Sequence, residues 1–173
     1  MAIALYDVTV PVFQQTLGAL EKVLERGLAH AGEHGIDPQS LVETRLFADM
    51  MPLRFQVVSA AHHSRGALEA AKTGVFVPPS AKTEYDYAGL QALVAETRAA
   101  LAQLTPEAVN AWEGNDVSFQ LGERKLPFTA PGFLLSFSLP NFYFHATTAY
   151  DILRMKGVPL GKRDFLGRLQ MKG

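Results

Sequence analysis

The sequence contains no cysteine, and this absence removes several kinds of chemistry at once. Without a thiol, the chain cannot form a disulfide, bind a metal through a thiolate or use a cysteine nucleophile. An excess of charge is also missing, because 16 Lys and Arg stand against 17 Asp and Glu, for a formal net charge of −1. A chain so close to neutrality lacks the basic surface that binds nucleic acid or an anionic membrane.

Long apolar runs are absent as well. No segment approaches the roughly 20 residues of a membrane-spanning helix. The first residues, MAIALYDVTVPVF, lack the basic region and the long apolar region of a signal peptide. We therefore expect a cytoplasmic protein that contacts neither nucleic acid nor membrane. P-loop, GxGxxG, GxSxG and HExxH motifs are missing too. The sequence therefore contains no complete catalytic or metal-binding motif from which a reaction could be inferred.

The composition is that of a globular protein. Hydrophobic residues make up 48% of the 173 residues and charged residues 19%, which is far from the composition of a disordered chain. A chain of this length is enough for one domain with one core. We therefore expect a single domain over residues 1–173.

Apolar side chains recur at spacings of three and four along most of the chain, which predicts long helices. Four are expected: residues 10–34, residues 51–73, residues 86–104, and a last helix that begins between Pro131 and Pro140 and ends at Gly157. Asp37 and Pro38 predict the start of a short helix, and a second short one follows over residues 105–112. Asp49 is expected to cap the helix over residues 51–73.

One segment alternates with period two. Apolar residues alternate over Val117–Leu121 and again over Leu126–Phe128, which predicts a β-hairpin with Pro127 on an edge strand. The Pro-rich residues 75–85 are expected to form a loop. The predicted fold class is therefore all-α, a four-helix bundle with one β-hairpin inserted before the last long helix.

Two further features concern the end of the chain. Leu160, Phe165 and Leu166 are too apolar to be left in water, so residues 158–169 are expected to dock on the bundle. Aromatic residues cover most of the circumference of the last helix, which favours a core face together with a subunit interface; they are Phe142, Tyr143, Phe144 and Tyr150. We therefore expect a homodimer.

His145 is the most informative candidate for a site. It shares a largely apolar, inward-facing side of the last helix with Asn141 and Thr148. Two interpretations remain open. His145 is either a core residue held by a backbone carbonyl, Thr148 or Asn141, or a metal ligand or acid–base group in the bundle core. Tyr150 and Gln56 complete the pocket candidates.

His62 and His63 stand in the middle of the second helix. With about 100° of rotation per residue, only one of them can face any given cavity. His62 falls on the side of Phe55, and His63 falls on the side of Gln56. His30 and His34 have a spacing that can hold a metal, but a solvated last helical turn is the simpler interpretation.

Two stretches carry a resemblance to a known family. They are LPNFYFHATTAYDILRMKGVPLGKRDFL over residues 139–166 and PLRFQVVSAAHHSRG over residues 52–66. Together with the order of the predicted elements, they resemble the DinB/YfiT-like superfamily, and most closely a bacterial branch known only as a domain of unknown function. The resemblance covers nearly the whole chain and implies a four-helix bundle, often dimeric.

The same resemblance implies a metal site. Many members of the superfamily hold a divalent metal with three histidines, one on the second helix and an H-x3-H pair on the last. Some members are similar to transferases or isomerases that use mycothiol, bacillithiol or glutathione. In this chain His62 or His63 matches the second-helix ligand, and His145 matches one member of the pair. The other member is replaced by Ala149, which cannot bind a metal, and Asn141 on the opposite side is a weak oxygen donor.

Three hypotheses follow. The first is a degenerate DinB-like bundle with a small inter-helix pocket near His145, an unknown small-molecule ligand and no tightly bound metal. The second is a thiol-linked transferase or hydrolase that depends on zinc or nickel, with His62 or His63, His145 and Asp49 as metal ligands. The third is a structural dimer without a ligand. The sequence leaves open whether the protein is an enzyme.

Overall fold

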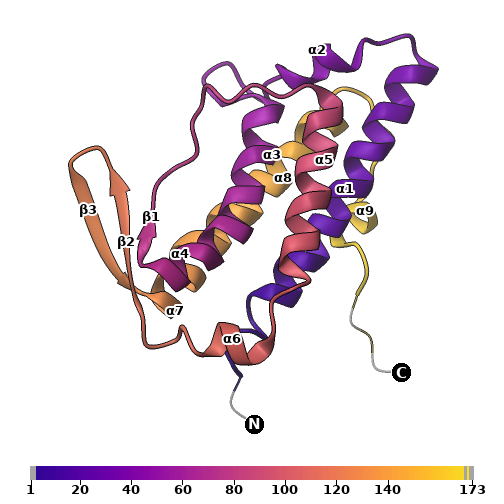
Figure 1. The fold of residues 1–173 in the computed structure, drawn as a ribbon. Helices are drawn as coiled ribbons and strands as arrows, with labels where there is room; N and C mark the ends of the chain where they lie inside the picture. Colours follow the sequence, from indigo (N-terminus) through magenta and orange to yellow (C-terminus); the bar gives the residue numbers. More distant parts are fainter. Residues whose placement is uncertain (1–2, 170, 172–173) are drawn as a thin grey trace.

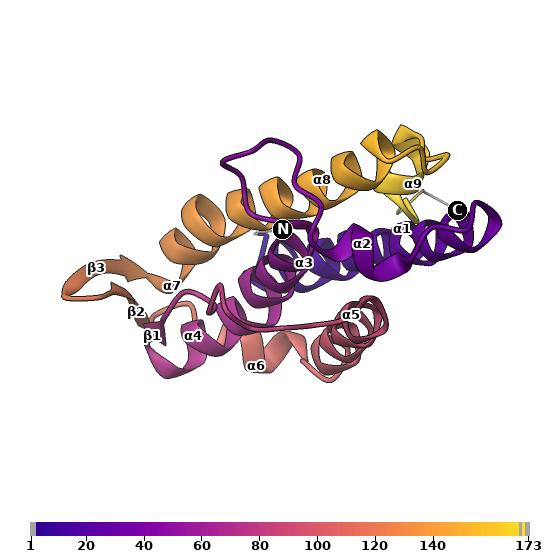
Figure 2. The ribbon, with the colours of Figure 1, turned by 90° about the horizontal axis from the view of Figure 1, so that it is seen from above.

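The structure is a computed structural model that describes residues 3–169 and 171. Long helical segments form its body, as the periodicity predicts (Figures 1 and 2). They are α1 (Val10–Glu33), the run α3 (Leu53–Ala61), η1 (His62–Gly66) and α4 (Ala67–Thr73), α5 (Tyr87–Leu101), and the run α7 (Ala130–Gly132), η2 (Phe133–Ser138) and α8 (Leu139–Met155). Among these, α3 packs against α8 and α5, and α1 packs against α5 and α8.

The buried face of α1 follows the predicted stripe for most of its length. The spacing of three and four residues predicts that Phe13, Leu17, Leu24 and Leu28 share one buried face. The first three are fully buried, but Leu28 is 40% exposed. Gly27 occupies the buried position at that level, where a Cβ atom would lie only 2.2 Å from the hydroxyl of Tyr87. The buried face at this level carries Leu24, Gly27 and Ala31, and Leu28, which follows Gly27 by about 100° of rotation, is more exposed.

Three helices start within a residue of their predicted positions. The Asp37 carboxylate accepts a hydrogen bond from the amide of Gln39 at the start of α2 (Pro38–Val42). Thr105 caps α6 (Pro106–Asn110) and Asp86 caps α5 in the same way. These caps satisfy backbone amides that have no partner within the helix.

The predicted cap of the second helix is wrong. Helix α3 begins at Leu53, with Pro52 in the N-cap position and no side-chain cap. The Leu53 amide instead donates to the backbone carbonyl of Thr44, at 2.8 Å. Asp49 is exposed in the connection between α2 and α3 and does not cap α3, since the Thr44 carbonyl accepts from the first amide of that helix.

The predicted hairpin is present, and it belongs to a three-stranded sheet with the order β1–β2–β3. Strands β2 (Asp116–Leu121) and β3 (Arg124–Thr129) are antiparallel, with Pro127 on the edge strand β3. Strand β1 (Val75–Phe76) runs parallel to β2, in a segment predicted to be a loop. The amide of Ser118 donates to the carbonyl of Gly74, so a partner far along the chain creates this short strand.

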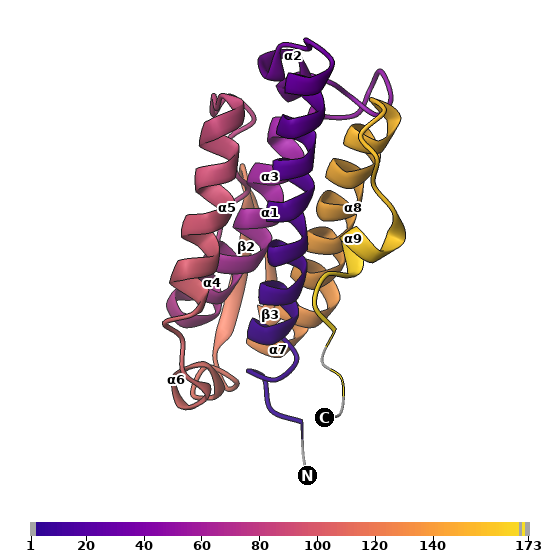
Figure 3. The same ribbon diagram turned by 90° about the vertical axis from the view of Figure 1, so that its right-hand side faces the viewer.

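Helix α9 (Lys162–Leu166) lies on α1 (Figure 3). Val158 and Leu160 are buried, and Gln15 of α1 donates to the carbonyl of Leu166 in α9, at 2.9 Å. The predicted docking is therefore confirmed, although the Leu166 side chain remains 38% exposed. Within the residues that the structure describes, no helix has the length and apolar character needed to cross a membrane.

Candidate functional site

Two histidines from facing helical segments come together in the structure. His63 lies in η1 and His145 in α8, with their ring centroids 5.7 Å apart and their planes 19° from parallel. His63 is buried, with 6% of its surface exposed, and His145 is half-buried. Of the two adjacent histidines that the sequence leaves open, His63 is therefore the one that stacks on His145.

Each helical run that carries one of the two histidines contains a π-helical turn. In η1 the amide of Ala67 donates to the carbonyl of His62, five residues earlier, and in η2 the amide of Leu139 donates to that of Leu134. Pro140 has no amide hydrogen to offer the carbonyl four residues before it, which explains why the helix is irregular just ahead of it. The widened turns bring η1 and η2 into contact, and π-turns of this kind are frequent at functional sites.

A serine from η2 fixes the tautomer of His63. The Ser138 hydroxyl donates to the backbone carbonyl of His63, at 3.0 Å. Its oxygen is then the acceptor for the Nδ1–H of the His63 ring, at 3.1 Å. The proton of the neutral ring is thereby assigned to Nδ1, and Nε2 carries a lone pair.

A buried glutamine does the same for His145. The amide nitrogen of Gln56 in α3 donates to the carbonyl of Met51, at 2.7 Å, which directs Oε1 of Gln56 toward the ring. This oxygen accepts from Nδ1 of His145, at 2.8 Å. Within the described part of the chain, the Nε2 atoms of His63 and His145 have no hydrogen-bond partner.

The surroundings of the pair keep both rings uncharged. Burial is the main cause that lowers the pKa of His63 to about 3, and the nearby His145 and His62 contribute to the same shift. Burial also lowers the pKa of His145 to about 4. At neutral pH the pair is therefore two neutral imidazoles with free acceptor nitrogens.

Aromatic rings lie next to both histidines and lower the polarity of their surroundings. Phe76 and Phe137 lie 5.2 and 5.7 Å from the His63 ring, measured between centroids. Phe144 and Phe55 lie 5.3 and 6.0 Å from the His145 ring. Phe76 comes from β1, so the short strand that the sequence did not predict brings an aromatic wall to the site.

The other pocket candidates make local bonds. Asn141 donates to the carbonyl of Phe137, and Thr148 donates to that of Phe144, so neither holds His145 as expected. Gln56 takes that role. Tyr150 packs against Phe165 of α9, with ring centroids 5.9 Å apart.

The second adjacent histidine points elsewhere. Nε2 of His62 lies 2.7 Å from the carbonyl of Val77, and its ring packs on Phe76 with centroids 4.5 Å apart. Burial lowers the pKa of His62, although the hydrogen bond to Val77 opposes this shift. His62 is therefore tied to the segment after β1.

The donor set does not match a three-histidine metal site. Among residues 3–169 and 171, no group of three or more His, Asp or Glu is placed to hold a metal ion. One helical turn after His145 stands Ala149, whose side chain has no donor atom, and exposed Asp49 does not complete such a group. Two imidazoles alone fall short of the ligands that structural or catalytic zinc takes.

Sequence reasoning missed Ser138 and Phe76, which contact His63 directly. Pro140 inside a helical stretch is a usable signal for Ser138, since it predicts an irregular turn within the preceding four residues. No local signal exists for Phe76. Its place depends on the pairing of β1 with a strand about forty residues later along the chain.

Comparisons with known proteins agree with this architecture. A family model described as "Domain of unknown function (DUF1993)" matches residues 5–166. The crystal structure of a DinB family member protein from Shewanella denitrificans is similar, with 28% sequence identity and a TM-score of 0.81 over 98% of this chain and 95% of that chain. No curated protein matches the chain. The chain therefore belongs to the DUF1993 family of domains of unknown function, and its helical fold is DinB-like.

Proposed function

We propose that this protein is a four-helix-bundle member of the DinB type whose metal site is degenerate, and that a small molecule binds in an inter-helix pocket at His63 and His145. The observation that supports this proposal is the hydrogen bonding of the His63 and His145 rings. Both Nδ1 atoms are hydrogen-bonded, and both Nε2 atoms lack a partner among the described residues. The pair therefore offers two uncharged acceptors next to aromatic rings.

The chemistry of the ligand follows from this arrangement. A neutral imidazole nitrogen accepts a hydrogen bond, so the ligand should carry hydroxyl or amine donors. The aromatic rings favour an apolar body, as small-molecule sites generally do. Depressed pKa values make both rings weak bases at neutral pH, so binding rather than proton abstraction is the role that we assign to them.

A gain-of-metal experiment tests the degenerate site. Ala149→His places a second imidazole one turn from His145 on the same side of α8. Thr147→His is the matched control, because Thr147 is an exposed residue of the same helix. All proteins are purified without chelators and without a metal-affinity tag, and metal per chain is measured by mass spectrometry.

We expect the parent and Thr147→His to contain well under one metal per chain, and Ala149→His to take up zinc or nickel. If Ala149→His gains nothing, His63 and the last helix do not share a degenerate metal site, and the proposal fails. A parent that already holds one metal per chain would contradict it too.

That last outcome would favour the second candidate, a metal-dependent, thiol-linked transferase or hydrolase. What favours this candidate is that both Nε2 atoms are unprotonated, as metal ligands must be. It needs a third ligand, which the described residues around the pair do not provide. Zinc would then raise the melting temperature of the parent by mass action.

A further inference from the structure

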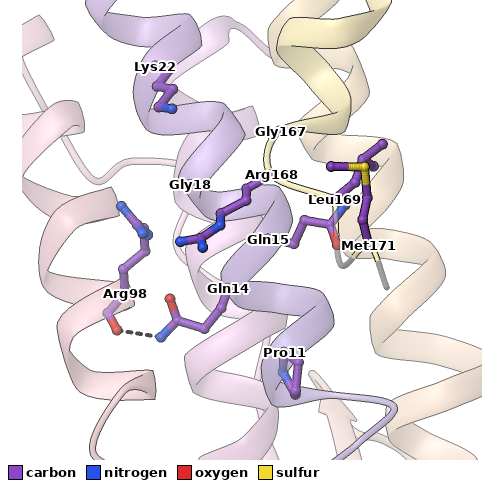
Figure 4. Close-up of a pocket in the computed structure, with 10 residues that line it drawn as sticks. All are labelled: Pro11, Gln14, Gln15, Gly18, Lys22, Arg98, Gly167, Arg168, Leu169 and Met171. Carbon is purple, nitrogen blue, oxygen red and sulfur yellow. Dashed lines mark hydrogen bonds between the residues drawn. The ribbon is translucent and has the colours of Figure 1, made fainter. Parts of the chain in front are cut away.

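A second candidate site lies on the other side of the helical body, where it shares no residue with the histidine pair. It is a pocket of about 580 Å³ between α1, α5 and the residues after α9 (Figure 4). Three cationic side chains line it, namely Lys22 of α1, Arg98 of α5 and Arg168 after α9. We call this the cationic pocket.

Two glycines allow the arginines to approach α1. A Cβ atom on Gly18 would lie 3.3 Å from the guanidinium carbon of Arg98. Gly167 has a positive φ of 63°, and its Cβ would lie 3.2 Å from the carbonyl oxygen of Gln15. Figure 4 shows the guanidinium of Arg168 extended across α1 toward that of Arg98.

The charges in the cationic pocket do not balance. Glu21 accepts a hydrogen bond from Nη1 of Arg98, which neutralises one of the two guanidiniums. Nε of Arg98 is buried without an acceptor among the described residues. A buried donor without a partner is costly. Lys22 and Arg168 leave the pocket with an excess of positive charge after Glu21 has paired with Arg98.

The opposite part of the same pocket has a different character. Pro11, Leu169 and Met171 contribute apolar surface there. Gln14 donates its amide hydrogen to the carbonyl of Arg98, at 2.7 Å, and so keeps its side-chain oxygen available as an acceptor. The volume exceeds what a bare phosphate needs, so there is room for an organic group.

We propose that the cationic pocket binds the phosphate monoester of a small organic molecule. Arg168 holds the phosphate by charge-assisted hydrogen bonds, which an arginine can form with two nitrogens at once, and Arg98 adds a guanidinium nitrogen that Glu21 does not engage. Lys22 adds positive charge, and the oxygen of Gln14 accepts from a ligand hydroxyl. The organic part packs on the apolar side chains.

The test uses the whole chain with two probes, inorganic phosphate and phenyl phosphate, titrated by calorimetry at constant ionic strength. We expect saturable binding of both, with phenyl phosphate tighter by about 10-fold because its ring buries apolar surface. Arg168→Gln should weaken both probes by about 10-fold or more, the usual scale for losing a charged hydrogen bond.

Arg163→Gln is the matched control, since Arg163 is an exposed arginine of α9 outside the pocket. It should leave both affinities within about twofold of the parent. Circular dichroism melts of each variant show whether it folds, and both replaced arginines are exposed. No saturable binding to the parent, or equal losses in the two variants, would overturn the cationic pocket as a phosphate site.

Discussion

Burial of an uncharged imidazole makes the folding of this protein sensitive to pH. His63 and His145 titrate near pH 6.5 in the unfolded chain, but their folded pKa values are about 3 and about 4. Below about pH 6.5 the unfolded chain therefore binds protons that the folded chain does not, and stability falls as the pH is lowered. We expect the free energy of unfolding, measured with urea, to fall steadily between about pH 6.5 and about pH 4.

Two variants show which residue causes the dependence of the free energy of unfolding on pH. His63→Gln removes the more strongly shifted group, so the loss of stability on acidification should become shallower. Gln39→Leu replaces an exposed residue of α2 whose side chain does not titrate, and should leave the slope as it is in the parent. Equal slopes for His63→Gln and the parent would show that His63 is protonated as readily in the folded protein as in the unfolded chain.

Gln56 is the residue that holds His145 in place, and its role can be measured separately. Gln56→Leu removes the acceptor from Nδ1 of His145 and leaves a partly buried donor unsatisfied. We expect a loss of about 1–3 kcal/mol in the free energy of unfolding. Gln39→Leu, at an exposed position of α2, is the control and should change stability by less than about 0.5 kcal/mol.

At the scale of elements, local chemistry was enough to predict most helices. The starts predicted at Asp37, at residue 86 and at residue 105 lie within a residue or two of the starts of α2, α5 and α6. These boundaries depend on capping bonds between neighbours in the sequence, so they can be read locally.

The features that escaped prediction depend on distant partners. Strand β1 is two residues long, too short for an alternating pattern, and exists through its pairing with β2. The π-turn of η1 contacts η2 through the bond from Ser138 to His63, about 75 residues apart. The choice between His62 and His63 rests on this contact, which explains why helical geometry alone left it open.

The C-terminal segment offers a test of an element that was predicted correctly. Truncation after Gly157 removes Val158 and Leu160, which are buried, so the melting temperature should drop clearly. Burial of each such side chain is worth about 1.5–3 kcal/mol. Leu160→Ala should reproduce much of the drop, whereas Leu166→Ala should have a small effect because Leu166 is 38% exposed. A truncated chain that melts like the parent would mean that the segment does not stabilise the fold.

At the scale of the whole molecule, exposed apolar residues on the last helical run favour a homodimer. Leu135, Tyr143 and Phe144 are 40%, 39% and 55% exposed. Exposed aromatic surface of this kind is typical of subunit interfaces. We predict that light scattering at micromolar concentration gives twice the chain mass of 18.9 kDa. Tyr143→Arg should shift the measured mass toward that of the monomer. Lys156→Ala, at an exposed position of the turn after α8, is the control. A parent of 18.9 kDa at all concentrations would refute the dimer.

The comparisons identify the fold of the whole molecule but not its function. Membership of the DUF1993 family and similarity to a DinB family structure establish a helical fold, but neither assigns a reaction. One fold hosts many functions, so function has to be argued from the site. Here the sequence identified His145 as a site residue and Ala149 as the position where a second histidine is missing. That Nε2 of His63 and of His145 is a hydrogen-bond acceptor follows only from the contacts of Ser138 and Gln56 in the structure.

Nitrogen-15 NMR of the imidazole rings tests the neutral, metal-free histidine pair most directly. At neutral pH, His63 and His145 should each show a protonated Nδ1 and an unprotonated Nε2, and these signals should hold until the pH falls to about 4 or below. One equivalent of zinc should leave both Nε2 signals of the parent unchanged and shift them in Ala149→His. Protonation of either ring near pH 6.5, or a stoichiometric zinc shift in the parent, would contradict the assignment of this site.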